Sequence, residues 1–254
     1  MVIGMIVMLS EVKRKGLDTD KALDLTIYTI IASVIGARLY YIIAFNLKYY
    51  ISNPLEVFAL RSGGLSIQGG LIAGIGFALI YTKIKKISFW KTADAFAPAI
   101  IIGQAIGRIG CDVFGRPMGN SYPWGVMVNS QLLHPVQLYE AGLNLLLFIY
   151  LMRKRSKVKY NGELFIKYII GFSLIRGFVE FFRFNPIVVG PFTVVHVTSL
   201  IIIIITLIIN NKIKKNQSVL KIINEEAINI PLLHFILIAL LGAFSIWFYY
   251  FIHG

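Results

Sequence analysis

The stretch A-L-D-L-T-I-Y-T-I-I-A-S-V-I-G-A-R-L-Y-Y-I-I-A-F, residues 22–45, decides the fold class. It carries one acidic and one basic side chain, Asp24 and Arg38, and is otherwise almost wholly apolar. A helix that crosses a bilayer needs about 20 consecutive, mostly apolar residues. The stretch therefore predicts a transmembrane helix.

Further apolar stretches of similar length follow along the chain. They cover residues 63–82, 93–114, 136–152, 163–182, 192–210 and 231–252. The run 1–9 is too short to span alone, so we expect either a truncated first span or a half-inserted helix; a cleaved signal peptide is less favoured because no basic region precedes the run. The pattern predicts an all-α, polytopic transmembrane helical bundle of about 7–8 spans with a central polar cavity.

The composition agrees with a membrane protein. Of the 254 residues 57% are hydrophobic, the mean hydropathy is +0.75, and only 15% are charged, against about 25% in soluble domains. These values exclude a soluble domain and a disordered chain, and the single cysteine, Cys111, excludes a disulfide scaffold.

The net charge of +13 is concentrated in four stretches, residues 13–21, 83–91, 153–167 and 212–221, which hold 18 of the 25 basic residues. They alternate with stretches that hold few, so the basic loops are predicted to be cytoplasmic and both chain ends to lie outside. This alternation disfavours a nucleic-acid partner, which would need one basic face. We expect a transmembrane domain at 1–210, then a basic loop and an extra transmembrane helix at 211–254.

The other basic residues are mostly arginines within the spans or toward their outer ends. They are Arg38, Lys48, Arg61, Arg108, Arg116, Arg176 and Arg183. An arginine at mid-membrane costs about 2.5–3.5 kcal/mol, and its planar fork suits phosphate or carboxylate. These positions predict a polar cavity, internal ion pairs or an anionic ligand, for which lipid phosphate is the natural candidate.

Three predicted spans carry polar residues at helical spacing. The sets are Gln104, Arg108, Cys111 and Asp112; Gln137, Glu140 and Asn144; and Arg176, Glu180 and Arg183. Residues at i, i+4 and i+7 share a helix face, so we expect three polar stripes facing inward. Local pairs, Arg108–Asp112 and Arg176–Glu180, are possible, and the alternative is an ion-pair network that only holds helices together.

Three other features each leave two interpretations open. The glycine-rich stretch 63–76, with Gln68 in its middle, predicts either close helix packing or a broken helix facing a cavity. His134 is either a proton acceptor or an interfacial residue at a helix start. Cys111 is a nucleophile or, more in keeping with a lone cysteine, a buried thiol. No metal-ligand spacing occurs, so no metal is expected.

Five motifs occur in order: G-A-R-L-Y-Y (36–41), G-G-L-S-I-Q-G-G-L-I (63–72), G-R-I-G (107–110), H-P-V-Q-L-Y-E (134–140) and R-G-F-V-E-F-F-R (176–183). Together they resemble the phosphatidylglycerol–prolipoprotein diacylglyceryl transferase family over about residues 3–210. The resemblance implies an enzyme of the bacterial inner membrane, with its active site toward the outer leaflet. Such an enzyme transfers diacylglyceryl from phosphatidylglycerol to the lipobox cysteine of preprolipoproteins, forming a thioether and releasing glycerol phosphate, without a cofactor.

The resemblance also implies site residues. As catalytic residues it implies Arg108, Arg176, Glu180 and His134. As substrate-binding residues it implies Arg108, Arg176, Arg183, Gln68, Gly69, Gly70, Tyr139, Gln137 and Glu140. The family has a histidine where this chain has Gln68 and an asparagine where it has Cys111. Either the arginines lower the thiol pKa enough that no dedicated base is needed, or the base is His134 or Glu180 and Gln68 only orients the headgroup. The alternatives are a non-enzymatic lipid-headgroup binder or transporter and a purely structural bundle.

Overall fold

The computed structural model describes residues 2–60, 63–120, 122–216, 242–244, 246–247 and 249–251. The chain divides into two compact units: a first unit, Met1–Glu11 with Ala93–Gly254, and a second unit, Val12–Thr92. The expected basic loop after residue 216 and most of the expected last span, 231–252, lie outside the described residues.

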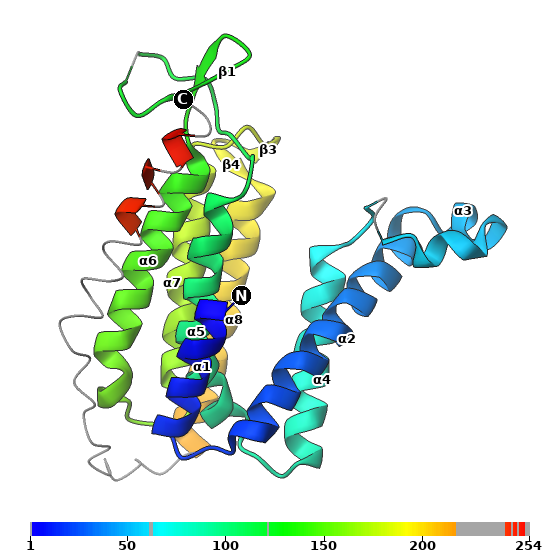
Figure 1. The fold of residues 1–254 in the computed structure, drawn as a ribbon, viewed down its shortest axis with the longest axis vertical. Helices are drawn as coiled ribbons and strands as arrows, with labels where there is room; N and C mark the ends of the chain where they lie inside the picture. Colours follow the sequence, from blue (N-terminus) through cyan, green and yellow to red (C-terminus); the bar gives the residue numbers. More distant parts are fainter. Residues whose placement is uncertain are drawn as a thin grey trace. The chain divides into compact units, whose positions relative to one another are not determined.

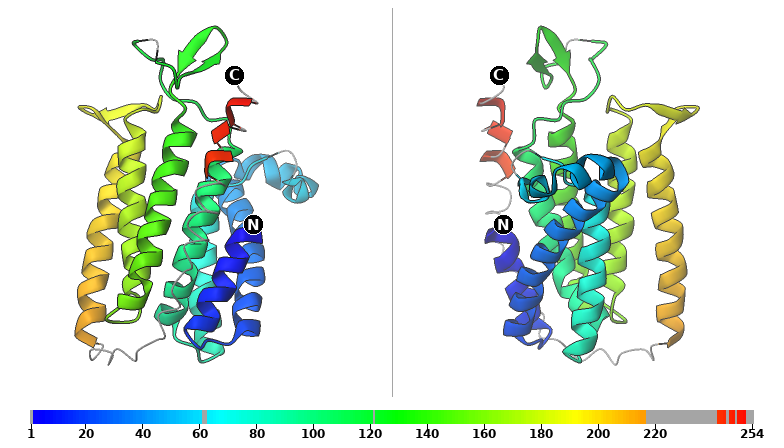
Figure 2. Two further views of the ribbon diagram at one scale, coloured as in Figure 1. Left: turned by 60° about the vertical axis from the view of Figure 1, so that its left-hand side comes forward. Right: turned by 90° about the vertical axis from the view of Figure 1, so that its right-hand side faces the viewer.

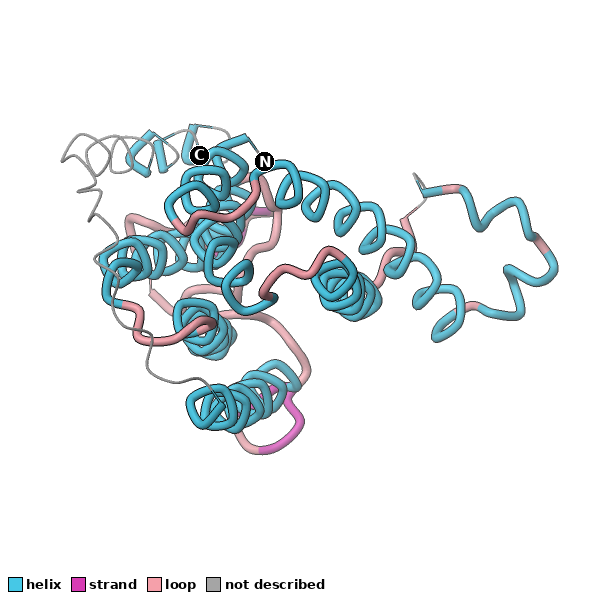
Figure 3. The backbone as a smooth tube through the Cα atoms, turned by 90° about the horizontal axis from the view of Figure 1, so that it is seen from below, coloured by secondary structure: helices cyan, strands magenta, loops and turns pink. Residues whose placement is uncertain are grey.

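The first unit is a bundle of long helices (Figure 1). Its elements are α1 (Val2–Arg14) and α5 (Phe89–Ile109), each mostly within the unit, with α6 (Val136–Lys154), the short 3-10 helix η3 (Arg155–Lys157), α7 (Glu163–Glu180) and α8 (Val194–Asn216). Helices α5 to α8 run side by side (Figure 2) and are seen end-on in Figure 3.

Apolar side chains of α5, α6 and α7 form the core of this unit. The buried members are Ala97, Ile101, Ile102, Leu147, Phe148, Leu151, Leu164 and Tyr168. Ile3 and Val7 of α1 pack against them. The N-terminal run therefore forms a helix of 13 residues, or about 20 Å, which is shorter than the bilayer core.

A carboxylate fixes where α7 begins. Asp94 of α5 is fully buried and accepts hydrogen bonds from the backbone N–H groups of Gly162 and Phe165, each at 2.9 Å. These amides belong to the first turn, where a helix has no internal acceptors. At the same end of the bundle, a buried ion pair between Glu11 and Arg155 joins α1 to η3.

Two small hairpins correct the all-α expectation to a predominantly helical fold. Strands β1 (Val126–Val128) and β2 (Gln131–Leu133) pair antiparallel, as do β3 (Ile187–Val189) and β4 (Phe192–Thr193). Both central residues of the first turn, Asn129 and Ser130, have positive φ, which gives the turn that matches the twist of a tight hairpin. The hairpins precede α6 and α8 and orient their first residues.

The second unit is a helical pair with an arm. Helices α2 (Thr19–Phe45) and α4 (Ile67–Ile84) pack together, and α3 (Leu47–Ser52) with the 3-10 helix η1 (Pro54–Phe58) forms the arm between them. A Cβ atom added at Gly69 would lie 2.4 Å from the Gly36 carbonyl oxygen, so only glycine permits this approach. The glycine-rich stretch thus serves close packing, one of its two predicted roles.

Arg38 of α2 holds the arm. Its five N–H groups donate to five backbone carbonyls, those of Glu56, Val57, Ala59, Gly63 and Gly64, at 2.6–3.2 Å. A guanidinium has five donors, and the side chain is only 4% exposed. Arg38 is therefore a structural residue with no donor left for an anion.

Among the residues that the structure describes, three helices are long and apolar enough to cross a membrane: Thr19–Phe45, Ile67–Ile84 and Val194–Lys215. Helices α5, α6 and α7 have 21, 19 and 18 residues, which is sufficient length, but polar residues lower their hydropathy. Those polar residues lie on the faces that form the candidate site.

Candidate functional site

Glu140 is the centre of a charged cluster in the first unit. Its Oε1 lies 3.0 Å from Nε of Arg108, and its Oε2 accepts a hydrogen bond from Nη1 of Arg176 at 2.9 Å. Nη2 of Arg183 lies 4.0 Å from the same Oε2. Three guanidinium groups therefore meet at one carboxylate. We call these four residues the arginine cluster.

Three helix ends bring the cluster together. Arg108 is in the last turn of α5, Glu140 is in the second turn of α6, and Arg176 is near the end of α7. Helix α7 ends at Glu180, so Arg183 reaches the cluster from the turn that follows rather than along the predicted helical stripe.

The turn that carries Arg183 is itself anchored. The backbone N–H of Arg183 donates to the Glu180 carbonyl at 3.0 Å, and Nε of Arg116 donates to the Arg183 carbonyl at 2.8 Å. A Cβ at Gly115 would lie 2.3 Å from the Phe182 carbonyl oxygen, so the segment after α5 crosses this turn in direct contact. Arg116 thus positions Arg183.

The cluster carries more positive than negative charge. Glu140 has no exposed surface, whereas the side chains of Arg108, Arg176 and Arg183 are 27%, 19% and 14% exposed. Burial, followed by the charge of Arg176, lowers the pKa of Arg183. The buried Glu140 carboxylate contacts all three guanidinium groups. The exposed parts of these groups can bind an anion such as a phosphate.

The ion pairs differ from the local pairs that helical spacing allowed. Arg176 pairs with Glu140 rather than with Glu180, because Oε1 of Glu180 accepts hydrogen bonds from Asn185 at 2.6 Å and Thr193 at 2.9 Å. Arg108 also pairs with Glu140, and α5 ends at Ile109, so Cys111 and Asp112 lie beyond its helical face.

Glu180 belongs to a second network, next to the cluster. Thr193 of β4 joins it to α8, because the Thr193 backbone N–H donates to Nδ1 of His196 at 3.1 Å. Glu180 is fully buried, and its Oε2 and the Nε2 of His196 have no hydrogen-bond partner among the residues that the structure describes. The network fixes the C-terminal end of α7.

The polar stripe of α6 faces inward as predicted. Gln137, Glu140 and Asn144 are all fully buried. Nε2 of Gln137 donates to the hydroxyl of Tyr249 at 2.5 Å. Within the described parts of the chain, Oε1 of Gln137 and both amide atoms of Asn144 have no partner.

His134 lies between β2 and α6, beside the end of α7. Its Nδ1 is 3.2 Å from the Tyr139 hydroxyl, and its ring centroid is 5.2 Å from that of Phe182. Burial lowers the pKa of His134 from the ordinary value of 6.5. The imidazole is thus neutral at pH 7 and able to accept a proton.

Gln68, Gly69 and Gly70 belong to the second unit and are described with it. Oε1 of Gln68 accepts a hydrogen bond from Ser66 at 2.7 Å, and both glycines lie at close contacts between α2 and α4. Their contact with a substrate stays a prediction.

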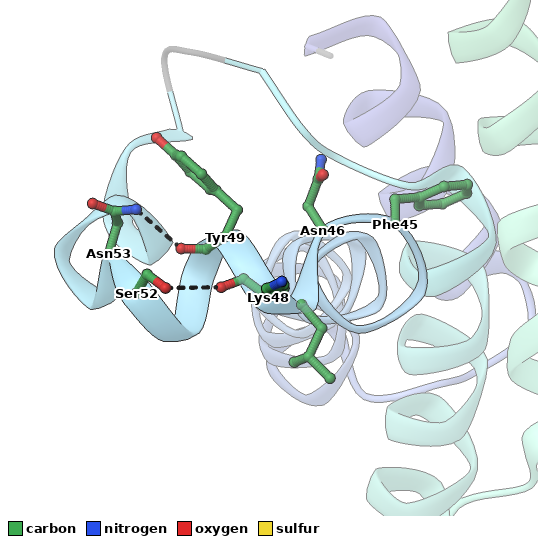
Figure 4. A pocket seen from close by; sticks show the side chains of 7 residues that line it. Phe45, Asn46, Lys48, Tyr49, Ser52 and Asn53 are labelled. Atoms are coloured by element: carbon green, nitrogen blue, oxygen red, sulfur yellow. Dashed lines mark hydrogen bonds between the residues drawn. The ribbon is translucent and has the colours of Figure 1, made fainter.

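Figure 4 shows a pocket of about 470 Å³ in the second unit, around α3. It is lined by Phe45, Asn46, Leu47, Lys48, Tyr49, Ser52 and Asn53. None of the predicted site residues lines it. In the parts of the chain that the structure describes, no group of three or more His, Cys, Asp or Glu residues could hold a metal ion.

Sequence reasoning missed five residues around the site: Arg116, Asn185, Thr193, His196 and Tyr249. Arg116 is one of the arginines that the sequence places within the spans or toward their outer ends, but its spacing assigns it no partner. The contacts of Thr193 and Tyr249 cross between segments, and helical periodicity does not encode such contacts.

Apolar helices with an arginine cluster at their polar ends are typical of an integral membrane protein. The family model of prolipoprotein diacylglyceryl transferase matches residues 1–211, and the chain belongs to this family.

Curated relatives named phosphatidylglycerol–prolipoprotein diacylglyceryl transferase agree with this assignment. The protein of Clostridioides difficile (strain 630) is 40% identical over 203 residues, covering 79% of this chain and 82% of its own. Those of Bacillus cytotoxicus and Listeria innocua are 36% and 37% identical, covering 82% and 85% of this chain and 82% and 83% of their own.

Proposed function

We propose that this chain is a phosphatidylglycerol–prolipoprotein diacylglyceryl transferase of the bacterial inner membrane. It transfers diacylglyceryl from phosphatidylglycerol to the lipobox cysteine thiol of a preprolipoprotein, the first step of lipoprotein maturation. The observation that carries the proposal is the convergence of Arg108, Arg176 and Arg183 on the single carboxylate of Glu140.

The arginines bind the lipid phosphate and stabilise it as it leaves. The thiol sulfur attacks the glyceryl carbon, a C–S bond forms, and the C–O bond to phosphate breaks, so the electron pair goes to the phosphate oxygen. Glycerol phosphate then carries one more negative charge than the lipid phosphate did. Guanidinium groups already in place stabilise that charge without reorganising, which is commonly the largest single contribution to catalysis.

Glu140 keeps the arginines in place before the lipid arrives. Three mutually repelling cations would separate without a shared anion, and a carboxylate behind them offsets part of that repulsion. Because Glu140 is fully buried and the arginines are partly exposed, the phosphate approaches from the open side.

The proton of the thiol needs an acceptor. A free cysteine has a pKa of about 8.5, and the positive field of the cluster lowers it. His134 is the better candidate acceptor, because its imidazole is neutral and partly exposed, whereas Glu180 is fully buried with Oε1 occupied by Thr193 and Asn185. Glu180 then positions the end of α7.

The remaining residues of the site act around the cluster. Tyr139 holds His134, and Gln137 adjoins Glu140 on the buried face of α6. Gln68, Gly69 and Gly70, which belong to the second unit, are assigned to lipid binding by the family resemblance alone. No cofactor takes part, and the two substrates are the partners of the chain.

The same bundle supports a multi-pass topology of about 7–8 spans around a polar cavity. In the first unit the arginine cluster lies at one end, and Arg153, Lys154, Lys214 and Lys215 end α6 and α8 at the other. Lysine-rich ends favour the cytoplasm, so the cluster belongs toward the outer leaflet.

A transfer assay with labelled phosphatidylglycerol and a lipobox peptide tests the function. We expect thioether-linked diacylglycerol on the peptide with the wild-type protein. The Arg108→Ala variant should lose transfer by at least about 100-fold, as for other groups that stabilise a developing anion.

The matched control is Arg153→Ala, which removes an exposed guanidinium from the opposite end of α6. It should keep transfer within about twofold. Unchanged transfer by a well-expressed Arg108→Ala variant would contradict the role of the cluster, and absence of the thioether product with wild type would contradict the function itself.

A further inference from the structure

Residues from the C-terminal end of the chain contact the site helix. The family model ends at residue 211, yet three later residues meet parts of the first unit. The Tyr249 hydroxyl accepts the hydrogen bond of Gln137, and the Tyr250 hydroxyl donates to the Trp124 carbonyl at 2.7 Å. A Cβ at Gly242 would lie 3.3 Å from the side chain of Leu145. The C-terminal residues lie beside the upper part of α6 in Figure 1.

The contact between Tyr249 and Gln137 is fully enclosed. Tyr249 is 1% exposed and Gln137 is 0% exposed, although 112 positions separate them in sequence. A buried amide without its partner is destabilised, and Oε1 of Gln137 already has no partner among the described residues. The Tyr249 hydroxyl therefore determines how this amide is held.

Gln137 lies on the same face of α6 as Glu140, one turn earlier. Tyr249 therefore contacts α6 on the face that carries Glu140. Excluding water there strengthens the attraction between the arginines and a phosphate, because charges interact more strongly where the local dielectric is low.

We propose that Tyr249, from beyond the family match, is a positioning residue of the lipid site, which fixes Gln137 and keeps water from the Glu140 face of α6. This inference rests on the proposed function, because the site it completes is the phosphate site of the transferase. It gives Tyr249 a role in binding phosphatidylglycerol.

The test compares Tyr249→Phe with wild type in the labelled-lipid assay. Losing the hydroxyl should raise the KM for phosphatidylglycerol about tenfold, the effect of one buried hydrogen bond, and leave kcat within about twofold. In Tyr249→Ala, which also removes the ring, KM should rise further and more steeply with salt than in wild type, because water and ions then reach the cluster. A purely structural role would lower the amount of folded protein without changing KM or its salt dependence.

Tyr250→Phe is the matched control. It removes a neighbouring hydroxyl whose partner is a loop carbonyl, and it should leave KM and its salt dependence unchanged. In a Gln137→Leu background, Tyr249→Phe should add no further change, because Tyr249 acts through Gln137.

The two proposals fail in different ways. An active wild type with an unchanged Tyr249→Phe variant, or additive effects in the double variant, would overturn the role of Tyr249 alone. A wild type that forms no thioether product would overturn the proposed function.

Discussion

Arg38 and the arginine cluster show how one residue type serves structure and function. Arg38 donates all five of its N–H groups to backbone carbonyls. Arg108, Arg176 and Arg183 instead share Glu140 and keep exposed edges. An arginine can bind a ligand only with N–H donors that no protein acceptor already uses. The number of protein acceptors around each guanidinium therefore distinguishes a structural arginine from a ligand-binding one.

His134 gives a pH prediction at the residue scale. Its pKa in the folded protein is below 6.5 because burial disfavours the charged imidazolium. The unfolded chain therefore binds the proton at higher pH than the folded chain does. The stability due to neutral His134 is complete above about pH 6.5 and is lost as the pH falls through the folded pKa.

The variant His134→Asn removes the titration and keeps an acceptor for Tyr139. As the pH falls below about 6.5, we expect the melting temperature of wild type to fall more than that of His134→Asn. Above about pH 7 the difference between the two proteins should be constant. Thermal unfolding in detergent across this range measures both curves, and parallel curves throughout would contradict the assignment.

At the scale of elements, the periodicity of apolar residues predicts the helices well and their ends less well. The stretch 22–45 forms α2 and 136–152 forms α6, each with ends shifted by at most three residues. The stretch 63–82 begins as a helix only at Ile67, because Gly63 and Gly64 have positive φ values of 84° and 76°. The apolar stretch indicates which residues lie within the bilayer, whereas the backbone conformation determines at which residue the helix begins.

Gly69 tests the packing of α2 on α4. A methyl group at this position would lie 2.4 Å from the Gly36 carbonyl oxygen, so Gly69→Ala must separate the helices. We expect a loss of about 1–3 kcal/mol in the free energy of unfolding. Gly76→Ala is the control on the same helix, because a Cβ there meets nothing within 4 Å; it should stay within about 1 kcal/mol of wild type.

Thermal unfolding and lipid transfer should be measured together on both variants. If Gly69→Ala loses transfer at full stability, Gly69 contacts the lipid directly and its packing role is secondary. Destabilisation by Gly76→Ala equal to that of Gly69→Ala would refute the packing argument.

At the scale of the whole molecule, the candidate site was only partly readable from the sequence. The face of α6 was predicted correctly, since Gln137, Glu140 and Asn144 are all buried, whereas Arg183 lies beyond the end of α7 and off its predicted stripe. The partners were not predicted, because Arg176 and Glu140 are 36 positions apart and meet only when two helices pack. Spacing along one helix assigns a residue to a face, and the choice of partner depends on which helix packs against that face.

The orientation of the bundle gives the last prediction. Met127 in the β1–β2 hairpin is 61% exposed at the end of the first unit that carries the cluster, and Lys154 ends α6 at the basic end. Helices α5 to α7 are 18–21 residues long, enough to cross a hydrocarbon core of about 30 Å. The two positions should therefore lie on opposite sides of the membrane.

Cysteine labelling of intact cells can test whether Met127 and Lys154 lie on opposite sides of the membrane. In a Cys111→Ser background, which removes the one native thiol, Met127→Cys should react with a membrane-impermeant maleimide added outside. Lys154→Cys should react only after the membrane is opened, because a basic helix end stays in the cytoplasm. The reverse pattern would place the arginine cluster on the cytoplasmic side, away from a substrate cysteine that has already crossed the membrane. Equal labelling of both positions from outside would mean that α6 does not span the bilayer.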